Sequence, residues 1–281
     1  MGILNVTPDS FSDGGRWLDP DAALRHAERM VLDGAQVIDV GGESTRPGAV
    51  PVPEEEELRR VIPVIRLLAK RLRVVMSIDT SKAEVARCAL EEGASLVNDV
   101  SALQGDVGMA ETIARAGVPV ILMHRRGTPQ TMQRAARYHD VVEEVKTFLA
   151  QAITHAVARG IASSRILIDP GLGFGKTVRH NLQLIGRLDT LKELGCPVVL
   201  GPSRKSFIGG TLQLPVEERV EGTLACVAYG LLHGVEMVRV HDVRPTVRFI
   251  TMWKAIQSTN ATRRQHRSRG HGQTSALRIL A

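Results

Sequence analysis

The stretch DAALRHAERMVLDGAQVIDV, residues 21–40, contains a complete helix-to-strand unit. Its apolar residues recur at helical spacing over 21–33 and then form a short β-branched run over 36–40. Gly34 stands between the two patterns, where a glycine can end a helix in the left-handed conformation without a Cβ clash. The stretch therefore predicts an amphipathic helix that leads directly into a buried parallel strand.

The same unit recurs along the chain, and further glycines mark the helix ends: Gly93, Gly117, Gly160, Gly195 and Gly234. Predicted strands cover 2–6, 36–40, 73–79, 96–99, 118–123, 165–169, 197–201 and 235–240. Predicted helices cover 21–33, 54–70, 82–92, 109–116, 140–159, 182–194, 216–233 and 244–256. Strand and helix units in such a series indicate an α/β fold, a single-domain (β/α)8 TIM barrel. An open doubly wound sheet is the alternative, but the even spacing of the units favours closure.

The composition agrees with one barrel followed by a different kind of segment. The chain has 281 residues, of which 43% are hydrophobic and only 3% aromatic, so the core must consist mostly of aliphatic side chains. We predict that residues 1–257 form the barrel. Residues 258–281 contain five arginines and no acidic residue, and they lose hydrophobic periodicity, which predicts a basic, disordered tail.

The charge and the cysteines exclude several other classes of protein. Most of the net charge of +6 comes from the tail, so the charge is weak support for nucleic-acid binding, and we expect none. The cysteines Cys88, Cys196 and Cys226 form no CxxC pair, as is typical of reduced thiols in a cytoplasmic protein. Neither a signal peptide nor an apolar run of about 18 residues is present, so we expect no membrane span.

Polar residues gather at the C-terminal ends of the predicted strands, where barrels of this kind carry their ligand sites. They are Asn5, Asp39, Asp79, Asn98, Asp99, His124, Asp169, Ser203, Lys205, Arg239 and His241. A buried carboxylate is costly without a partner, so the convergence of Asp39, Asp79 and Asp169 indicates a polar ligand. For Asp99, Asp140 and Asp242 we prefer a helix cap or a hydrogen bond between loops.

Three glycine-rich loops follow strands: NVTPDSFSDGG (5–15), GGESTRPG (41–48) and PGLGFGK (170–176). Glycine lets backbone N–H groups approach an anion closely, although the third loop does not have the spacing of a P-loop. The basic residues Arg46, Lys205, Arg239 and His241 stand at the same rim. With Asn5 they could hold a diphosphate and Mg²⁺, which takes oxygen ligands and keeps several waters.

Seven motifs together, in order and spacing, resemble the dihydropteroate synthase family from residue 1 to about residue 256. They are MGILNVTPDSFSDGG (1–15), IDVGGESTRPG (38–48), SIDT (77–80), NDVS (98–101), DPGLGFGK (169–176), GPSRKSFIGG (201–210) and RVHD (239–242). The resemblance implies a transferase of folate biosynthesis that condenses 6-hydroxymethyl-7,8-dihydropterin pyrophosphate with p-aminobenzoate to 7,8-dihydropteroate and pyrophosphate. It also implies Mg²⁺ as the cofactor, inhibition by sulfonamides, and a homodimer packed through helices at 216–233 and 244–256.

The resemblance further implies roles for individual residues. The pterin ring would be bound by Asp39, Asp79, Asn98, Asp169 and Lys205. Pyrophosphate would be bound by Thr45, Arg46, Arg239 and His241, with Asn5 as the metal ligand. The p-aminobenzoate pocket would be formed by Phe11, Pro47, Phe174, Ser203 and Lys205. The catalytic residues would be Asp13, Asp39, Asp79 and Lys205.

Three features depart from the family pattern. Met1 stands directly at the first strand, Arg125 occupies a position that is usually apolar in the family, and the arginine-rich tail has no expected counterpart.

Three other functions compete with the one that the resemblance implies. A pterin-binding methyltransferase is disfavoured by the SRKS run at 203–206, and a catalytically silent barrel by the retained Asn5, Lys205 and Arg239. A nucleic-acid binder acting through the tail is disfavoured because the tail has no aromatic residue for stacking.

Overall fold

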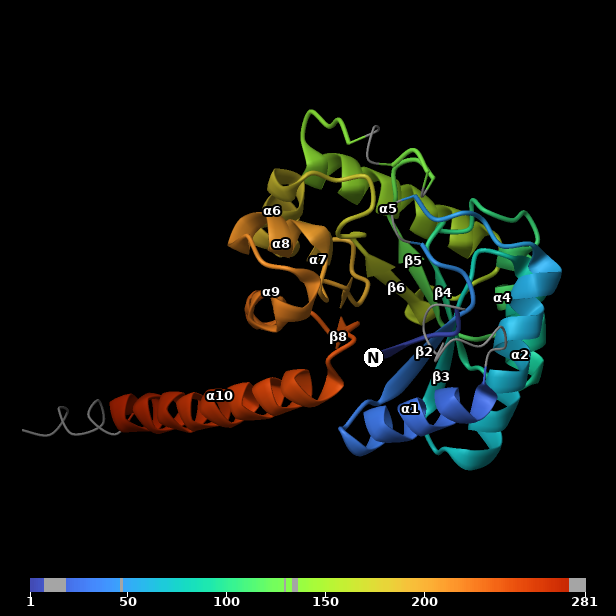
Figure 1. Ribbon diagram of the computed structural model, residues 1–281. Coiled ribbons are helices and arrows are strands. Elements are labelled where there is room, and N and C mark those ends of the chain that lie inside the picture. Colours follow the sequence, from blue (N-terminus) through green and yellow to red (C-terminus); the bar gives the residue numbers. More distant parts are fainter. Residues whose placement is uncertain (8–18, 46–47, 129, 133–135, 273–281) are drawn as a thin grey trace, which may run out of the picture.

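The computed structural model describes residues 1–7, 19–45, 48–128, 130–132 and 136–272, with side chains as far as Thr259 (Figure 1). Within these residues each strand overlaps one predicted strand. The strands are β1 (Gly2–Asn5), β2 (Val37–Gly41), β3 (Val75–Asp79), β4 (Leu96–Asp99), β5 (Val120–Met123), β6 (Ile166–Asp169), β7 (Val199–Leu200) and β8 (Met237–Val238).

The strands close into a ring. β1 to β6 form one parallel sheet in chain order, and β7 pairs with β8. Parallel bridges between Ile168 and Val198 and between Gly2 and Val240 join the two groups on both sides. The backbone N–H of Ile3 donates to the carbonyl of Val240 over 3.0 Å, which adds a further bond at the second junction. The predicted (β/α)8 barrel is therefore confirmed.

The helices cover the outside of the ring (Figure 1). They are α1 (Pro20–Leu32), α2 (Glu54–Arg71), α3 (Ala83–Glu91), α4 (Met109–Ala116), α5 (Val141–Ala158), α6 (Val178–Gly186), α7 (Leu188–Lys192), α8 (Ser206–Leu212), α9 (Val220–Leu232) and α10 (Val243–Gly272), with short 3-10 turns at Ser163–Arg165 and Val216–Glu218. The six glycines predicted to end helices all have positive φ, from 64° at Gly117 to 114° at Gly93.

Two helices differ from the prediction. The single helix expected over 182–194 is divided into α6 and α7 at Arg187, whose backbone is not helical (φ −126°, ψ 37°). α8 was not predicted, because Gly209 and Gly210 give its sequence low helix propensity. A Cβ at Gly209 would lie 2.2 Å from the guanidinium of Arg219, so a larger residue there would require that side chain to move.

The last helix spans the boundary that we predicted between barrel and tail. α10 continues without interruption past residue 257 to Gly272 and projects away from the barrel (Figure 1). The segment 258–272 contains no proline, and extending an existing helix avoids the cost of nucleation. No helix among the described residues is long and apolar enough to cross a membrane.

The two-residue period of the strands divides the barrel interior into an apolar floor and a polar layer. The floor is a small cluster of inward side chains, Val37, Leu96, Ile121 and Val199, with Met1, Leu167 and Met237 packed against it. The polar layer consists of Asp39, Asn98, Asp169 and Arg239. Each of them comes two residues after one of the floor residues Val37, Leu96, Leu167 and Met237, and therefore points to the same face of the sheet. The polar layer thus lies above the floor, at the end of the barrel where the strands finish.

Candidate active site

A cavity of about 1280 Å³ opens at the C-terminal ends of the strands, bordered by described residues from most of the strand-to-helix loops. Eight of the predicted site residues line it: Asn5, Thr45, Asp79, Phe174, Ser203, Lys205, Arg239 and His241. Asp39, Asn98 and Asp169 do not line it, because they are buried just beneath it, with 0%, 4% and 5% of their surfaces exposed. Phe11, Asp13, Arg46 and Pro47 lie outside the described residues.

Arg239 is the centre of the polar layer. Its Nε donates to Oδ2 of Asp39 over 2.6 Å, and its Nη2 donates to Oδ2 of Asp79 over 2.7 Å. Nδ2 of Asn98 donates to the same Asp39 oxygen over 3.0 Å. Asp39 therefore lies behind the guanidinium and holds it in place, while Asp79 reaches the cavity wall.

The charges of this cluster are only partly balanced. Burial raises the pKa of Asp79 to about 7, and the lowering effect of Arg239 does not fully offset it, since Asp39 adds a like charge. The pKa of Arg239 is raised above its usual value because the two carboxylates outweigh its desolvation. The cationic Arg239 is thus permanent at neutral pH, and it presents positive charge to the cavity.

Lys205 and Asp169 form a second polar pair, from the loop after β7 and from β6. Nζ of Lys205 donates to the carbonyl of Leu172 and lies 4.7 Å from the ring centroid of Phe174. Burial lowers the pKa of Lys205 to about 8, against the opposing charge of Asp169. Oδ1 of Asp169 accepts from the backbone N–H of Gly171 over 2.7 Å, and burial raises the pKa of this carboxyl.

Ser203 and His241 form a third contact at the rim, next to Arg239. Oγ of Ser203 lies 3.0 Å from Nδ1 of His241, and the backbone N–H of His241 donates to the same hydroxyl over 3.1 Å. Below them, Arg204 donates to both carboxylate oxygens of Asp242 over 2.8 and 2.6 Å. This pair ties the loop after β7 to the loop after β8, so both loops present their polar groups together.

The structural roles proposed for Asp140 and Asp242 are confirmed, and Asp99 holds its own loop instead of capping a helix or joining two loops. Asp140 caps α5 by accepting from the backbone of Val142 over 2.9 Å. Asp99 accepts from the backbone N–H groups of Ser101 and Leu103, both over 2.7 Å. Asp242 makes the contact between loops described above. None of the three needs a ligand to explain its burial or position.

Sequence reasoning missed the ion pairs that support the second glycine-rich loop. Nζ of Lys82 contacts the carboxylates of Glu43 in that loop and Glu57 in α2. Arg60 donates to the carbonyl of Gly42 over 2.8 Å. Glu57 is only 1% exposed, and it lies four residues before the buried Val61 on the apolar side of α2. An acidic residue on an apolar helix stripe was the signal that could have revealed this network.

The comparisons with known proteins agree with this geometry. The family model for pterin binding enzymes matches residues 1–241. The dihydropteroate synthase of Escherichia coli K12 is 46% identical over 264 residues, which cover 94% of this chain and 93% of that protein. The chain belongs to the dihydropteroate synthase family.

Solved structures of this family have the same fold. A Yersinia pestis dihydropteroate synthase in complex with a sulfonamide drug aligns with a TM-score of 0.87 at 47% identity, covering 92% of this chain and 93% of that one. A Xanthomonas albilineans dihydropteroate synthase in complex with 7,8-dihydropteroate aligns with a TM-score of 0.83 at 46% identity, covering 91% and 92%. This chain is accordingly a transferase of folate biosynthesis, as predicted from its motifs.

Proposed function

We propose that this dihydropteroate synthase joins 6-hydroxymethyl-7,8-dihydropterin pyrophosphate to p-aminobenzoate in the cavity above the polar layer. The observation that supports this most directly is the set of side chains at the cavity. Lys205 and Phe174 line it above the buried carboxylate of Asp169, and Arg239 and His241 line it as well. The first group suits a hydrogen-bonding heterocycle and an arylamine, and the second suits a diphosphate.

The pterin is assigned to the buried polar groups at the bottom of the cavity. A pterin presents an amino group and a ring N–H side by side, and a carboxylate accepts from two such donors. Asp169 is suited to this role because its Oδ1 is already fixed by Gly171 N–H. Asn98 and Asp79 add an amide and a carboxyl group, and Lys205 adds a donor for ring nitrogen and oxygen atoms. Asp39 contributes by holding Arg239 and Asn98 rather than by facing the cavity.

Pyrophosphate is assigned to Arg239, His241 and Thr45, with Arg46 as a further predicted ligand. These groups would stabilise the negative charge that develops on the leaving diphosphate. Asp79, beside Arg239, would stabilise positive charge on the pterin methylene. Because the amine of p-aminobenzoate is a weak nucleophile, we propose a dissociative route in which the C–O bond breaks before the C–N bond forms.

The donor set fits a divalent cation of the Mg²⁺ type. Asn5 brings an amide oxygen to the cavity, while Asp39 and Asp79 are paired with Arg239. Among the described residues no group of three or more His, Cys, Asp or Glu side chains gathers as a metal site. A single protein oxygen therefore suits a hard cation that takes its other ligands from phosphate and water. When bound, it would neutralise charge on the diphosphate.

The p-aminobenzoate pocket is assigned to Phe174, Ser203 and the aliphatic part of Lys205, with Phe11 and Pro47 as further predicted walls. Sulfonamides would bind the same pocket, as the Yersinia pestis relative carries such a drug. We also propose a cytoplasmic location, which Cys88, Cys196 and Cys226 support because all three are unpaired.

The function is tested by supplying both substrates with Mg²⁺ or with excess chelator and measuring dihydropteroate and pyrophosphate. We expect product only with Mg²⁺. In Asn5→Leu, which has nearly the same shape but no amide oxygen, the Mg²⁺ concentration for half-maximal rate should rise at least about tenfold. Chelator-resistant turnover would contradict the metal assignment, and an absolute need for p-aminobenzoate in pyrophosphate release would contradict the dissociative route.

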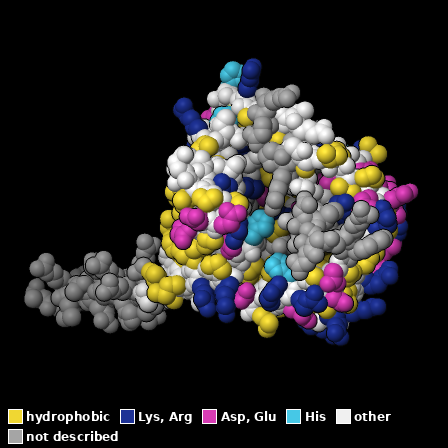
Figure 2. Space-filling model, in the orientation of Figure 1, with side chains coloured by type: hydrophobic (Ala, Val, Ile, Leu, Met, Phe, Trp, Pro, Cys, Tyr) yellow, Lys and Arg dark blue, Asp and Glu magenta, His cyan; other side chains and the backbone are white. Residues whose placement is uncertain are grey.

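A homodimer through α9 and α10 is proposed from the apolar surface of these helices. Tyr229, Leu232, Met252 and Ile256 are 38%, 61%, 62% and 50% exposed, and hydrophobic side chains gather over this region in Figure 2. Sedimentation should give a particle of two 30.6 kDa chains, and Leu232→Glu with Met252→Glu should give the single chain. The control Val107→Glu, at a 98% exposed position elsewhere, should remain dimeric. A monomeric wild type would contradict the proposal.

A further inference from the structure

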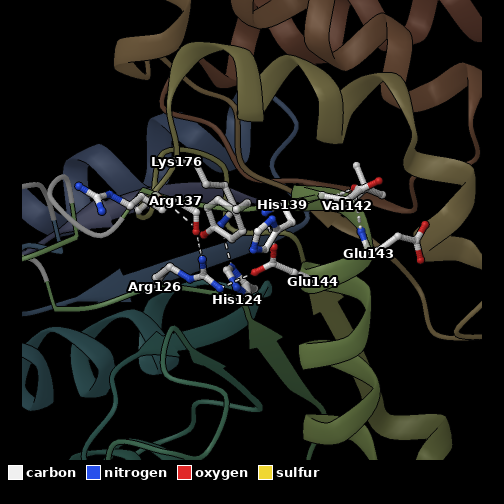
Figure 3. A network of polar contacts seen from close by, with 11 residues as sticks. His124, Arg126, Arg137, His139, Val142, Glu143, Glu144 and Lys176 are labelled. Atoms are coloured by element: carbon white, nitrogen blue, oxygen red, sulfur yellow. Dashed lines mark hydrogen bonds and ion pairs between the residues drawn. The ribbon is translucent and has the colours of Figure 1, made fainter.

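The loop that carries Phe174 is held by a buried lysine to which no role has yet been assigned. Lys176 is 4% exposed, and its Nζ donates to the carbonyls of Gly171 over 2.9 Å and Phe174 over 3.1 Å. The same nitrogen lies 2.8 Å from Nδ1 of His124 at the end of β5. Figure 3 shows Lys176 and His124 pointing toward one another from their two loops.

The charges of this pair are set by burial. Burial lowers the pKa of His124 to about 2, with Lys176 adding to the effect, so the imidazole is neutral at physiological pH. In the tautomer that carries its proton on Nε2, the neutral imidazole of His124 accepts at Nδ1 and is a third acceptor for the ammonium form of Lys176. The pKa of Lys176 is also lowered well below its usual value by burial. Three acceptors around one amine satisfy its donors without any carboxylate in contact.

Each other residue of the loop also has a backbone group in a hydrogen bond. The N–H of Gly173 donates to Oδ1 of Asn181 over 2.7 Å, and the hydroxyl of Tyr138 donates to the carbonyl of Gly175 over 3.0 Å. The carbonyl of Leu172 receives Lys205. These bonds hold the loop backbone in one conformation, which fixes both the Phe174 ring and the Leu172 carbonyl that accepts from Lys205.

The fifth loop supports the same arrangement from the other side. Arg126 donates to the carboxylate of Glu144 over 2.6 Å (Figure 3). Its guanidinium also lies 3.9 Å from the centroid of the Tyr138 ring. Gly171 packs so tightly on β5 that a Cβ there would lie 1.8 Å from the carbonyl oxygen of His124. His124 therefore reaches Lys176 across a contact between two loops that admits no side chain.

We infer that Lys176, which His124 holds in place, is a positioning residue for the arylamine side of the site. It fixes the loop 171–175 through the carbonyls of Gly171 and Phe174, and thereby the place of the Phe174 ring. The pterin side depends less on it, because Asp79, Asn98 and Asp169 stand on strands. This inference rests on the proposed function only for the identity of the arylamine. The order of the loop is independent of that function.

The test compares Lys176→Met, which keeps the length of the side chain but has no donor, with two variants of His124. His124→Asn places an amide oxygen near the position of Nδ1, so an acceptor remains. His124→Leu has the same number of side-chain heavy atoms as His124→Asn but no acceptor. In Lys176→Met and His124→Leu, KM for p-aminobenzoate should rise about tenfold or more, while KM for the pterin pyrophosphate stays within about twofold. His124→Asn should recover most of the loss seen in His124→Leu.

Amide hydrogen exchange of the peptide that covers 170–177 gives a second readout that needs no turnover. We expect exchange about tenfold or more faster in Lys176→Met than in wild type, with slow exchange largely restored in His124→Asn relative to His124→Leu. Unchanged exchange in Lys176→Met, or equal rises in both KM values, would overturn the inference. A wild type that makes no dihydropteroate would overturn the proposed function instead, and the exchange comparison would still decide the role of Lys176.

Discussion

Arg239→Met should lower the free energy of unfolding by about 3–5 kcal/mol at neutral pH and abolish product formation. Arg239 neutralises Asp39, which is fully buried, and Asp79, which is 8% exposed. Removing one member of a buried ion-pair cluster leaves the others charged without compensation, which is the costly case. Chemical denaturation of wild type and variant, followed by circular dichroism, measures the loss.

The pH dependence of this loss identifies its cause. Without Arg239 the pKa of Asp79, already raised to about 7 by burial, should rise further. The folded variant then binds protons that the unfolded chain has released, so its stability should increase as the pH falls from 8 to 5. The matched control is Arg66→Met, which removes an exposed pair with Glu92 and should show no comparable loss. An Arg239→Met variant as stable as wild type at pH 7 would contradict the explanation.

Lys205→Met should lower kcat/KM for p-aminobenzoate by about 10²–10³-fold. The substitution removes the ammonium that faces Asp169, the donor to the Leu172 carbonyl and the cation near the Phe174 ring. Methionine keeps a flexible apolar chain, so packing changes little. Lys146→Met, which removes a surface pair with Glu193, should leave kcat/KM unchanged. A loss below threefold would show that Lys205 does not bind or stabilise the reacting groups.

The wild-type pH profile provides a second check on Lys205. Burial lowers its pKa to about 8, so the amine is charged below that pH and loses its proton above it. If the charged form is needed, kcat/KM should decline as the pH rises through about 8. The guanidinium of Lys205→Arg stays charged throughout this range, so its residual activity should lack the decline. An identical decline in both proteins would assign it to another group.

Much of the fold could be predicted from the chain because each unit carries local signals. The strands are short β-branched runs, the helices are amphipathic, and glycines such as Gly34 and Gly117 adopt the left-handed conformation that ends a helix. The helix α8 was missed because Gly209 and Gly210 give its sequence low helix propensity, and the packing of these glycines beside Arg219 and Val178 leaves no local signal.

The site could be predicted by position but not by depth. Parallel strands end on one side of a barrel, so polar residues at strand ends were expected to converge. Asp39 and Asp79 look alike in sequence, yet only the second reaches the cavity. The difference depends on Arg239, 200 residues beyond Asp39, which covers one carboxylate and stands beside the other. Pairings over such separations leave no local signal.

The weakest part of the barrel wall carries much of its chemistry. β7 and β8 have two residues each, and single bridges join them to β6 and β1, yet Ser203, Lys205, Arg239 and His241 follow directly from these two strands. A substrate that spans Asp169 on β6 and Arg239 after β8 would connect the firmly paired strands to the loosely paired ones. A bound ligand would then stabilise the folded chain most where β7 and β8 join β6 and β1. The binding energy would therefore help to keep the barrel closed as well as promote the reaction.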